Sequence, residues 1–147
     1  MEGQTEQVLL RICPALLADG DWERALRRLA EEASAAVAVD AERIYADARE
    51  REETEPTYIG MGLAVPHARV KGLKRACLSV AFSPEGIPWP QEKAHIIALL
   101  VVPWEAPEMH LQLLSRLVRW RRSLSAEEAQ ASAPSADSLV ASLQAAF

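Results

Sequence analysis

Residues 95–102 of the chain read HIIALLVV, an almost continuous apolar run. A strand inside a sheet with both faces covered carries such a run, because neither face meets water. The run is much shorter than the roughly 20 apolar residues that a membrane-spanning helix needs. We therefore expect a central strand at 95–102 with helices on both faces of its sheet, which is an α/β arrangement.

Three segments on the N-terminal side of this run are typical of further strands. Residues 76–82, ACLSVAF, precede Pro84-Glu85-Gly86, which predicts a turn. Residues 58–66 end at Pro66, which lacks the N–H that a strand interior uses. Residues 8–12 predict a short strand as well. We expect a mixed sheet that includes strands at 60–66, 76–82 and 95–102.

Two helices are expected between the strands at 8–12 and 58–66. Asp21 suits the N-cap of a helix that runs to about Ala36, because its side chain can accept a hydrogen bond from the first turn. Asp40 suits the N-cap of a second helix, which should end near Glu53, ahead of a proline.

Two more helices are expected after the central strand. Pro107 suits the first turn of one, and Ser135 or Asp137 could cap the other. Residues 123–135, rich in Ser, Ala and Glu, predict a connector between them. The side chains expected to face the core are Leu111, Leu114, Leu117 and Val118 in the first helix and Leu139, Val140 and Leu143 in the second.

Helices and strands alternate along the chain, without an internal repeat. A chain of 147 residues is long enough to bury a proper core. We expect residues 1–147 to form a single domain, an α/β/α sandwich with a mixed sheet and helices on both faces.

The composition limits the partners and the compartment. The net charge of −5 argues against a nucleic-acid or anionic-membrane partner. The start, MEGQTEQ, lacks the positive and apolar regions of a signal peptide. Cys13 and Cys77 are isolated in the sequence, so neither a disulfide framework nor a zinc site is indicated. We expect a cytoplasmic protein with reduced thiols and no insertion into a membrane.

The stretch 59–69, IGMGLAVPHAR, places a histidine directly after a strand and a proline. Pro66 biases Val65 toward an extended conformation, so His67 is expected at the end of the strand, where its side chain can meet solvent. Taken alone, such a histidine is either a working group or one that falls there by chance. Gly60-Met61-Gly62 lacks the third glycine of a dinucleotide-binding loop, and the three histidines of the chain lack metal-ligand spacing. We expect no metal and no organic cofactor.

The run from Glu52 to Ala68 resembles the signature of enzyme IIA domains of the fructose/mannitol type (type 2) in the bacterial phosphoenolpyruvate-dependent phosphotransferase system. Glu52 matches the acidic or amide residue that opens the signature. After six positions, Ile59-Gly60 supplies its aliphatic and small residues. Leu63-Ala64-Val65-Pro66-His67-Ala68 then supplies the aliphatic, small, aliphatic, Pro, His and small residues that close it. The resemblance covers roughly residues 8–122.

This resemblance implies a phosphohistidine carrier, and so a phosphotransferase component. His67 would accept a phosphoryl group from an HPr-like phosphocarrier protein and pass it to a cysteine of an enzyme IIB component in sugar uptake. His110 and Arg51 match other residues of the family site, and Arg69 is often present in relatives. Thr57 and Arg69 are expected to bind the phosphate.

The physical chemistry suits these residue types. A neutral imidazole has a free lone pair near neutral pH and can attack phosphorus without a strong base. Phosphoryl transfer then depends on positioning and on charge stabilisation around the phosphoryl oxygens. Arg51 could bind two oxygens through its fork, and His110 and Thr57 could donate hydrogen bonds. The site should be open to a docking protein.

Simpler interpretations exist for several of these residues. His110 could cap a helix, Arg51 could belong to a solvated helix end, and Thr57 could stabilise a turn. His95 begins the expected central strand and should be structural. Trp104 should pack in the core or line a docking surface.

A nitrogen-type regulatory phosphoprotein is the alternative to a role in sugar uptake. Its phosphorylation state would control regulated partner proteins through the same His67. A domain that has lost phosphorylation is a third option, against which the complete signature argues. Because the chain shows no fused IIB or IIC segment, we expect its IIB partner to be a separate polypeptide.

Overall fold

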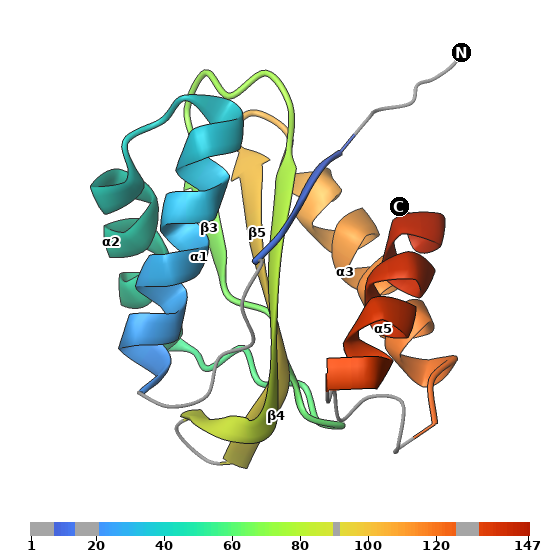
Figure 1. Cartoon of the computed structure of the whole chain (residues 1–147). Helices are drawn as coiled ribbons and strands as arrows, with labels where there is room; N and C mark the ends of the chain where they lie inside the picture. The colour runs from blue at the N-terminus through green and yellow to red at the C-terminus, as the bar shows by residue number, and fades with distance from the viewer. Residues whose placement is uncertain (1–7, 14–20, 90–91, 126–132) are drawn as a thin grey trace.

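A five-stranded mixed sheet separates two pairs of helices, as Figure 1 shows. The computed structural model describes residues 8–13, 21–89, 92–125 and 133–147. Helices α1 (Trp22–Val37) and α2 (Ala41–Thr54) cover one face of the sheet, and α3 (Pro107–Arg122) and α5 (Ala133–Ala146) cover the other. The expected α/β/α architecture with a mixed sheet is confirmed.

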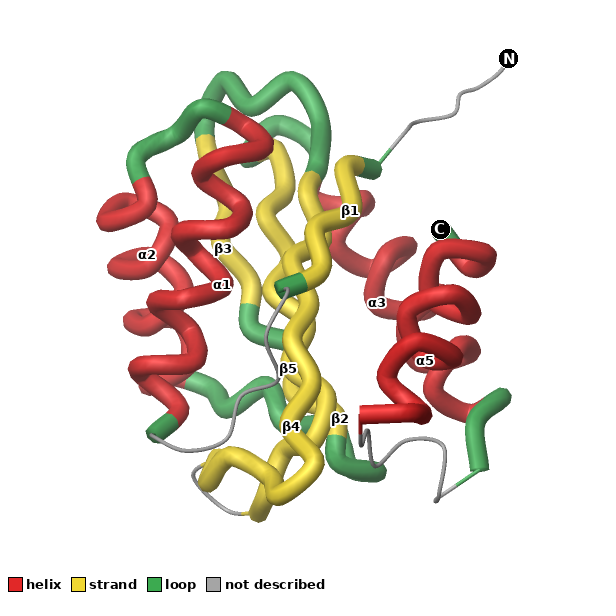
Figure 2. The backbone as a smooth tube through the Cα atoms, in the orientation of Figure 1, coloured by secondary structure: helices red, strands yellow, loops and turns green. Residues whose placement is uncertain are grey.

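The two long strands, β4 and β5, lie at the centre of the sheet, and the short strands lie at its edges (Figure 2). Strand β1 pairs parallel with β4, β4 pairs antiparallel with β5, and both β2 and β3 pair parallel with the other side of β5. The edge that β2 and β3 form lies between the two helical layers. The strands are β1 (Leu9–Ile12), β2 (Leu63–Ala64), β3 (His67–Val70), β4 (Cys77–Trp89) and β5 (Glu92–Pro103).

The continuous apolar run belongs to β5, the strand that was expected at the centre. Ile97, Leu99 and Val101 pack into the core beneath α1 and α2, and the alternate residues pack beneath α3 and α5. Both faces of β5 are therefore shielded from water, which explains why apolar and polar residues do not alternate along this strand. His95 lies inside this strand, and its Nδ1 is 3.0 Å from the Ser83 carbonyl oxygen. This contact agrees with a structural role.

The turn expected at Pro84-Glu85-Gly86 is wrong, because β4 continues through it to Trp89. The register with β5 shifts between Phe82 and Ile87, so a β-bulge accommodates these residues. Gly86 has a φ of +89°, and a Cβ there would lie 2.9 Å from Cβ of Lys93. A glycine followed by further strand residues marks a bulge as readily as a turn.

The strand expected to end at Pro66 is also corrected. Only Leu63–Ala64 forms β2, and after Pro66 the chain resumes as β3 in an unchanged register, with Leu63 opposite Ile96 and His67 opposite Leu100. An edge strand tolerates a proline, and the Pro66 carbonyl still accepts the Leu100 N–H at 2.9 Å. His67 therefore begins a strand instead of following one.

The N-terminal helices follow the expected boundaries closely. Asp21 caps α1, and its carboxylate accepts the Arg24 N–H at 2.9 Å. Asp40 occupies the N-cap position of α2, but its side chain makes no capping hydrogen bond.

The C-terminal helices differ from expectation in their faces and ends. Leu117 is buried as expected, but Leu111 is 65% exposed, because the buried stripe of α3 runs through Leu113, Leu117 and Trp120. Helix α5 begins at Ala133, so Ser135 and Asp137 lie within it and neither is its N-cap. Leu139 and Leu143 of α5 are buried as expected. Residues 126–132 of the expected connector lie outside the described residues. Within the described part of the chain, no helix is both long and apolar enough to span a bilayer.

Candidate functional site

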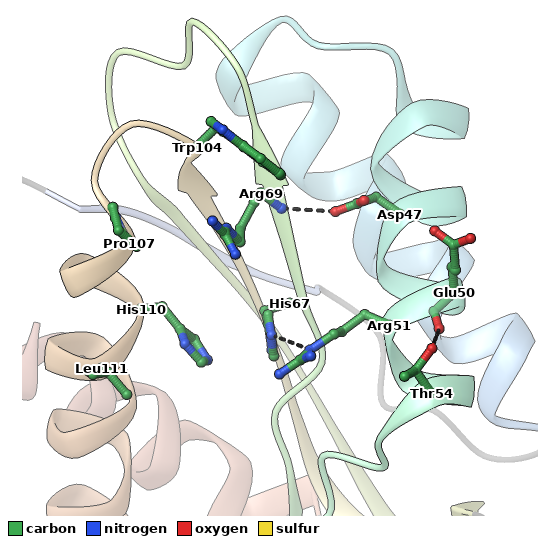
Figure 3. Close-up of a pocket in the computed structure, with 10 residues that line it drawn as sticks. All are labelled: Asp47, Glu50, Arg51, Thr54, His67, Arg69, Trp104, Pro107, His110 and Leu111. Carbon is green, nitrogen blue, oxygen red and sulfur yellow. Dashed lines mark hydrogen bonds between the residues drawn. The ribbon is translucent and has the colours of Figure 1, made fainter.

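A pocket opens at the edge of the sheet that β3 forms, between α2 and α3 (Figure 3). It has a volume of about 490 Å³. Both histidines that the resemblance assigns to the site reach this pocket, because His67 lies on β3 and His110 lies on α3. The lining residues are Asp47, Glu50, Arg51, Thr54, His67, Arg69, Trp104, Pro107, His110 and Leu111.

His67 and His110 meet at the floor of this pocket. Leu63 and Val65 pack on the α3 side of the sheet, and strand alternation places His67 on that side too. The first turn of α3 presents His110 to it, with ring centroids 4.1 Å apart and planes inclined by 34°. The two histidines that the resemblance assigns to one site therefore lie side by side.

Arg51 approaches the same imidazole from the opposite helical layer. It projects from the last turn of α2, and its Nε donates to Nε2 of His67 at 2.9 Å. A guanidinium only donates, so Nε2 must be the unprotonated nitrogen and the hydrogen of the neutral ring is assigned to Nδ1. Nδ1 is buried and makes no hydrogen bond to a described residue. The Arg51 side chain also pairs with Glu55 at 3.3 Å.

Both imidazoles are held in the neutral form. Burial, followed by the charges of His110 and Arg51, lowers the pKa of His67 to about 4. Burial and the charges of Arg51 and Arg69 also lower the pKa of His110. A group of cations around two imidazoles disfavours further protonation. At neutral pH Nε2 of His67 is therefore unprotonated, and its lone pair accepts the hydrogen bond from Arg51.

His67 is less accessible than the sequence suggested. Its side chain was expected to leave the core at a strand end, but the residue is only 6% exposed. Because β3 continues beyond Pro66, the ring lies against the sheet, at the base of a pocket that opens to solvent.

Arg69 and Thr57 occupy different parts of the site. Arg69 lines the pocket, with its guanidinium 4.4 Å from the centre of the Trp104 ring and its backbone N–H bonded to the Asp47 carboxylate at 2.9 Å. Thr57 lies beside a smaller hollow of about 140 Å³ that shares Arg51, His67 and His110 with the pocket. The Thr57 hydroxyl donates to Glu52 at 2.6 Å.

Glu52 has a role that the sequence did not reveal beyond its place in the signature. The carboxylate is buried and accepts three hydrogen bonds, from the Thr57 N–H, the Thr57 hydroxyl and Nε1 of Trp89, at 2.8, 2.6 and 2.8 Å. It ties the end of α2, which carries Arg51, to the end of β4. The burial of Glu52 could have been predicted from helical spacing, because Glu52 lies four residues after Ala48 and eight after Ile44, which are both buried.

Replacing Glu52 by glutamine should lower the free energy of unfolding by about 1–3 kcal/mol. The three donors would then face an amide that carries donors of its own. Urea unfolding measures the effect. Glu53→Gln is the matched control, because Glu53 is half exposed and its pair with Arg49 lies at the surface. Equal stability of the two variants would contradict the structural role of Glu52.

The low pKa of His67 predicts an acid-dependent stability. In the folded protein the pKa of about 4 lies below the ordinary value of 6.5. The contribution of the neutral His67 ring to the free energy of unfolding is therefore complete above pH 6.5 and is lost as the pH falls toward 4. The free energy of unfolding should fall across this window more steeply in the wild type than in His67→Gln. Urea unfolding at several pH values measures both proteins, and identical slopes would contradict the buried neutral ring.

Within the described residues, no cluster of three or more His, Cys, Asp or Glu side chains is arranged to hold a metal ion. The groups that meet at the pocket are the neutral His67 imidazole, a second imidazole and two guanidinium groups.

Solved IIA structures share this arrangement of layers. The nitrogen regulatory protein IIA-Ntr of Neisseria meningitidis superposes with a TM-score of 0.72, at 20% identity over 90% of this chain and 90% of that one. IIA mannitol of Escherichia coli gives a TM-score of 0.71, at 21% identity over 88% of this chain and 94% of that one. The fold is thus that of the mannitol-type and nitrogen-type IIA domains.

The family model for the phosphoenolpyruvate-dependent sugar phosphotransferase system, EIIA 2, matches residues 16–145, and the chain belongs to this family. The resemblance seen in the signature is thereby confirmed.

Curated relatives match a shorter part of the chain. The fructose-specific EIIA component of Haloferax volcanii is 34% identical over 73 residues, which cover 48% of this chain and 47% of the relative. The transcriptional regulator ManR of Bacillus subtilis is 37% identical over 67 residues, which cover 46% of this chain and 10% of ManR. The match thus spans about half of one relative and a tenth of the other.

Proposed function

We propose that this chain is a phosphohistidine carrier of a sugar phosphotransferase system, with His67 as the residue that is phosphorylated. The observation that carries the proposal is the neutral His67 ring, whose Nε2 lone pair is held by Arg51 beside His110 at the base of an open pocket. A phosphorylated HPr-like protein is the donor and a cysteine of an enzyme IIB component is the acceptor. Family membership supports the phosphotransferase part of this role.

Acceptance of the phosphoryl group is a single displacement at phosphorus. The Nε2 lone pair of His67 forms a new P–N bond, while the P–N bond to the donor imidazole breaks and its electron pair leaves with that imidazole. In the second transfer a cysteine thiolate of the IIB component forms a P–S bond, and the electron pair of the P–N bond returns to Nε2. His67 keeps its hydrogen on Nδ1 throughout and ends neutral, as it began.

The neighbouring side chains stabilise the charge on the transferred group. Arg51 must give up its hydrogen bond to Nε2 when phosphorus arrives, and its fork can then bind the phosphoryl oxygens. His110 and Arg69 line the same pocket and supply further donors. Thr57 would have to exchange Glu52 for a phosphoryl oxygen in order to bind it.

Exposed apolar side chains support a protein as the partner. Ile59, Trp104 and Leu111 are 39%, 47% and 65% exposed, and each lines one of the two hollows beside His67. Apolar surface around a reactive group is typical of a docking site. The complex of enzyme IIAMtl with phosphorylated enzyme IIBMtl from Escherichia coli contains a IIA chain of this fold, with a TM-score of 0.69 at 18% identity over 90% of this chain.

A regulatory role is a second candidate, and similarity to the transcriptional regulator ManR favours it. Both roles use the same phosphorylated His67. Incubation of the phosphorylated chain with a IIB domain separates them, since a purely regulatory domain would keep its phosphoryl group.

The phosphorylated form should be labile in acid, stable in base and independent of the cysteines. A phosphoramidate hydrolyses faster when its nitrogen leaving group is protonated. Cys13 and Cys77 are buried, and burial raises the pKa of Cys77 to about 12, which suppresses its thiolate.

Intact mass after incubation with phosphoenolpyruvate, enzyme I and HPr tests this chemistry. The wild type and the double variant Cys13→Ser, Cys77→Ser should each gain the mass of one phosphoryl group and lose it in acid only. Label that disappears with the cysteines, or that survives acid but not base, would overturn the proposed chemistry.

A further inference from the structure

We propose that Trp104 is a positioning residue, which holds the Arg69 guanidinium at the wall of the His67 pocket for the incoming phosphoryl oxygens. This inference rests on the proposed function of His67. The exposed indole of Trp104 would then affect the rate of phosphoryl transfer itself, in addition to any contact with a partner protein.

The backbone brings the two side chains together. Arg69 follows His67 by two residues in β3 and so lies on the same side of the strand. Trp104 directly follows β5, and its N–H donates to the carbonyl oxygen of Val70, the last residue of β3, at 3.0 Å. This hydrogen bond places the backbone of Trp104 beside the end of β3. Cζ of Arg69 lies 4.4 Å from the centre of the Trp104 ring, within the range of a cation–π contact, and Nζ of Lys71 lies farther away, at 5.6 Å.

Arg69 carries the guanidinium of the pocket that is still available to bind phosphoryl oxygens. Arg51 is already engaged by His67 and Glu55. In the described part of the chain, the Arg69 guanidinium forms no ion pair with a carboxylate, because Asp47 binds the Arg69 backbone N–H and leaves the side chain to Trp104.

The charge of Arg69 already acts on both histidines. It contributes to the lowered pKa of His110 and of His67, in each case less than burial and Arg51 do. A cation that affects the pKa of both rings is close enough to His67 for its position to influence phosphoryl transfer. The indole limits the conformations of a long, half-solvated side chain, which would otherwise spend part of its time pointing into water.

A small phosphoryl donor separates this role from protein docking. Phosphoramidate transfers its phosphoryl group to an imidazole with loss of ammonia and makes no contact with a docking surface. With this donor, Trp104→Leu should slow the phosphorylation of His67 roughly two- to fivefold, the effect of losing one exposed cation–π contact. Trp104→Phe, which keeps an aromatic face, should recover most of the rate.

A double-mutant cycle with Arg69→Met shows whether Trp104 acts through Arg69. Trp104→Leu should have no further effect once Arg69 is replaced, because coupled residues are not additive. Met61→Ala is the matched control, since Met61 is a similarly exposed apolar residue that lines neither hollow beside His67, and it should react at the wild-type rate.

Two results would overturn the inference. If Trp104→Leu slows only transfer from phosphorylated HPr, or slows the Arg69→Met background as much as the wild type, then Trp104 does not position Arg69. If the wild type takes up no phosphoryl group from either donor, the proposed function itself fails, and intact mass distinguishes this case from the first.

Discussion

Replacement of His67 by alanine should abolish phosphorylation while leaving the protein folded. In the proposed function, the lone pair that attacks phosphorus belongs to Nε2 of this ring, and alanine offers no nucleophile in its place. The low pKa of His67 means that its removal takes no charge from the core at neutral pH. The variant should therefore retain the circular dichroism spectrum of the wild type and show no added phosphoryl mass after incubation with phosphoenolpyruvate, enzyme I and HPr.

His95→Gln is a suitable control for loss of a histidine. His95 lies in β5, bonded to the Ser83 carbonyl, and lines neither hollow beside His67. This variant should still be phosphorylated. Undiminished labelling of a folded His67→Ala protein would rule out the assignment of the acceptor.

The second large effect is expected at His110. His110→Ala should still take up one phosphoryl group, but roughly 10²–10³ times more slowly, the usual loss when one donor to a charged transition state is removed. The ring lies 4.1 Å from His67, centre to centre, and lines the same pocket.

Rapid-quench measurement of phosphoryl uptake gives this rate, and intact mass at long times gives the extent. Full labelling at a reduced rate supports a stabilising role for His110. An unchanged rate would make the second imidazole incidental, and complete loss of labelling in a folded variant would make it the acceptor.

The layers of the fold could be predicted because they follow from local patterns. The apolar run of β5 required cover on both faces, and the Asp21 cap and the apolar face of the first helix follow simple spacing rules. The errors fall where tertiary pairing overrides a local signal. Pro66 and Gly86 each read as an end of a strand, whereas pairing with β5 carries the chain through both positions.

The residues of the candidate site could be predicted from the sequence better than their arrangement could. The signature identified His67, and the proximity of His110 and Arg51 to it is confirmed. The burial of His67 and the three hydrogen bonds to Glu52 depend on residues far apart in sequence, which no local pattern brings together.

The position of the phosphoryl group on the protein tests the central claim most directly. Nuclear magnetic resonance of the wild type, with ¹⁵N-labelled histidine and a ³¹P-active phosphoryl group, identifies the nitrogen bonded to phosphorus. The hydrogen bond from Arg51 predicts a single phosphorus–nitrogen coupling, at Nε2 of His67, with the hydrogen retained on Nδ1. Coupling at His110, at His95 or at Nδ1 of His67, or phosphorus without any coupling to nitrogen, would contradict the account.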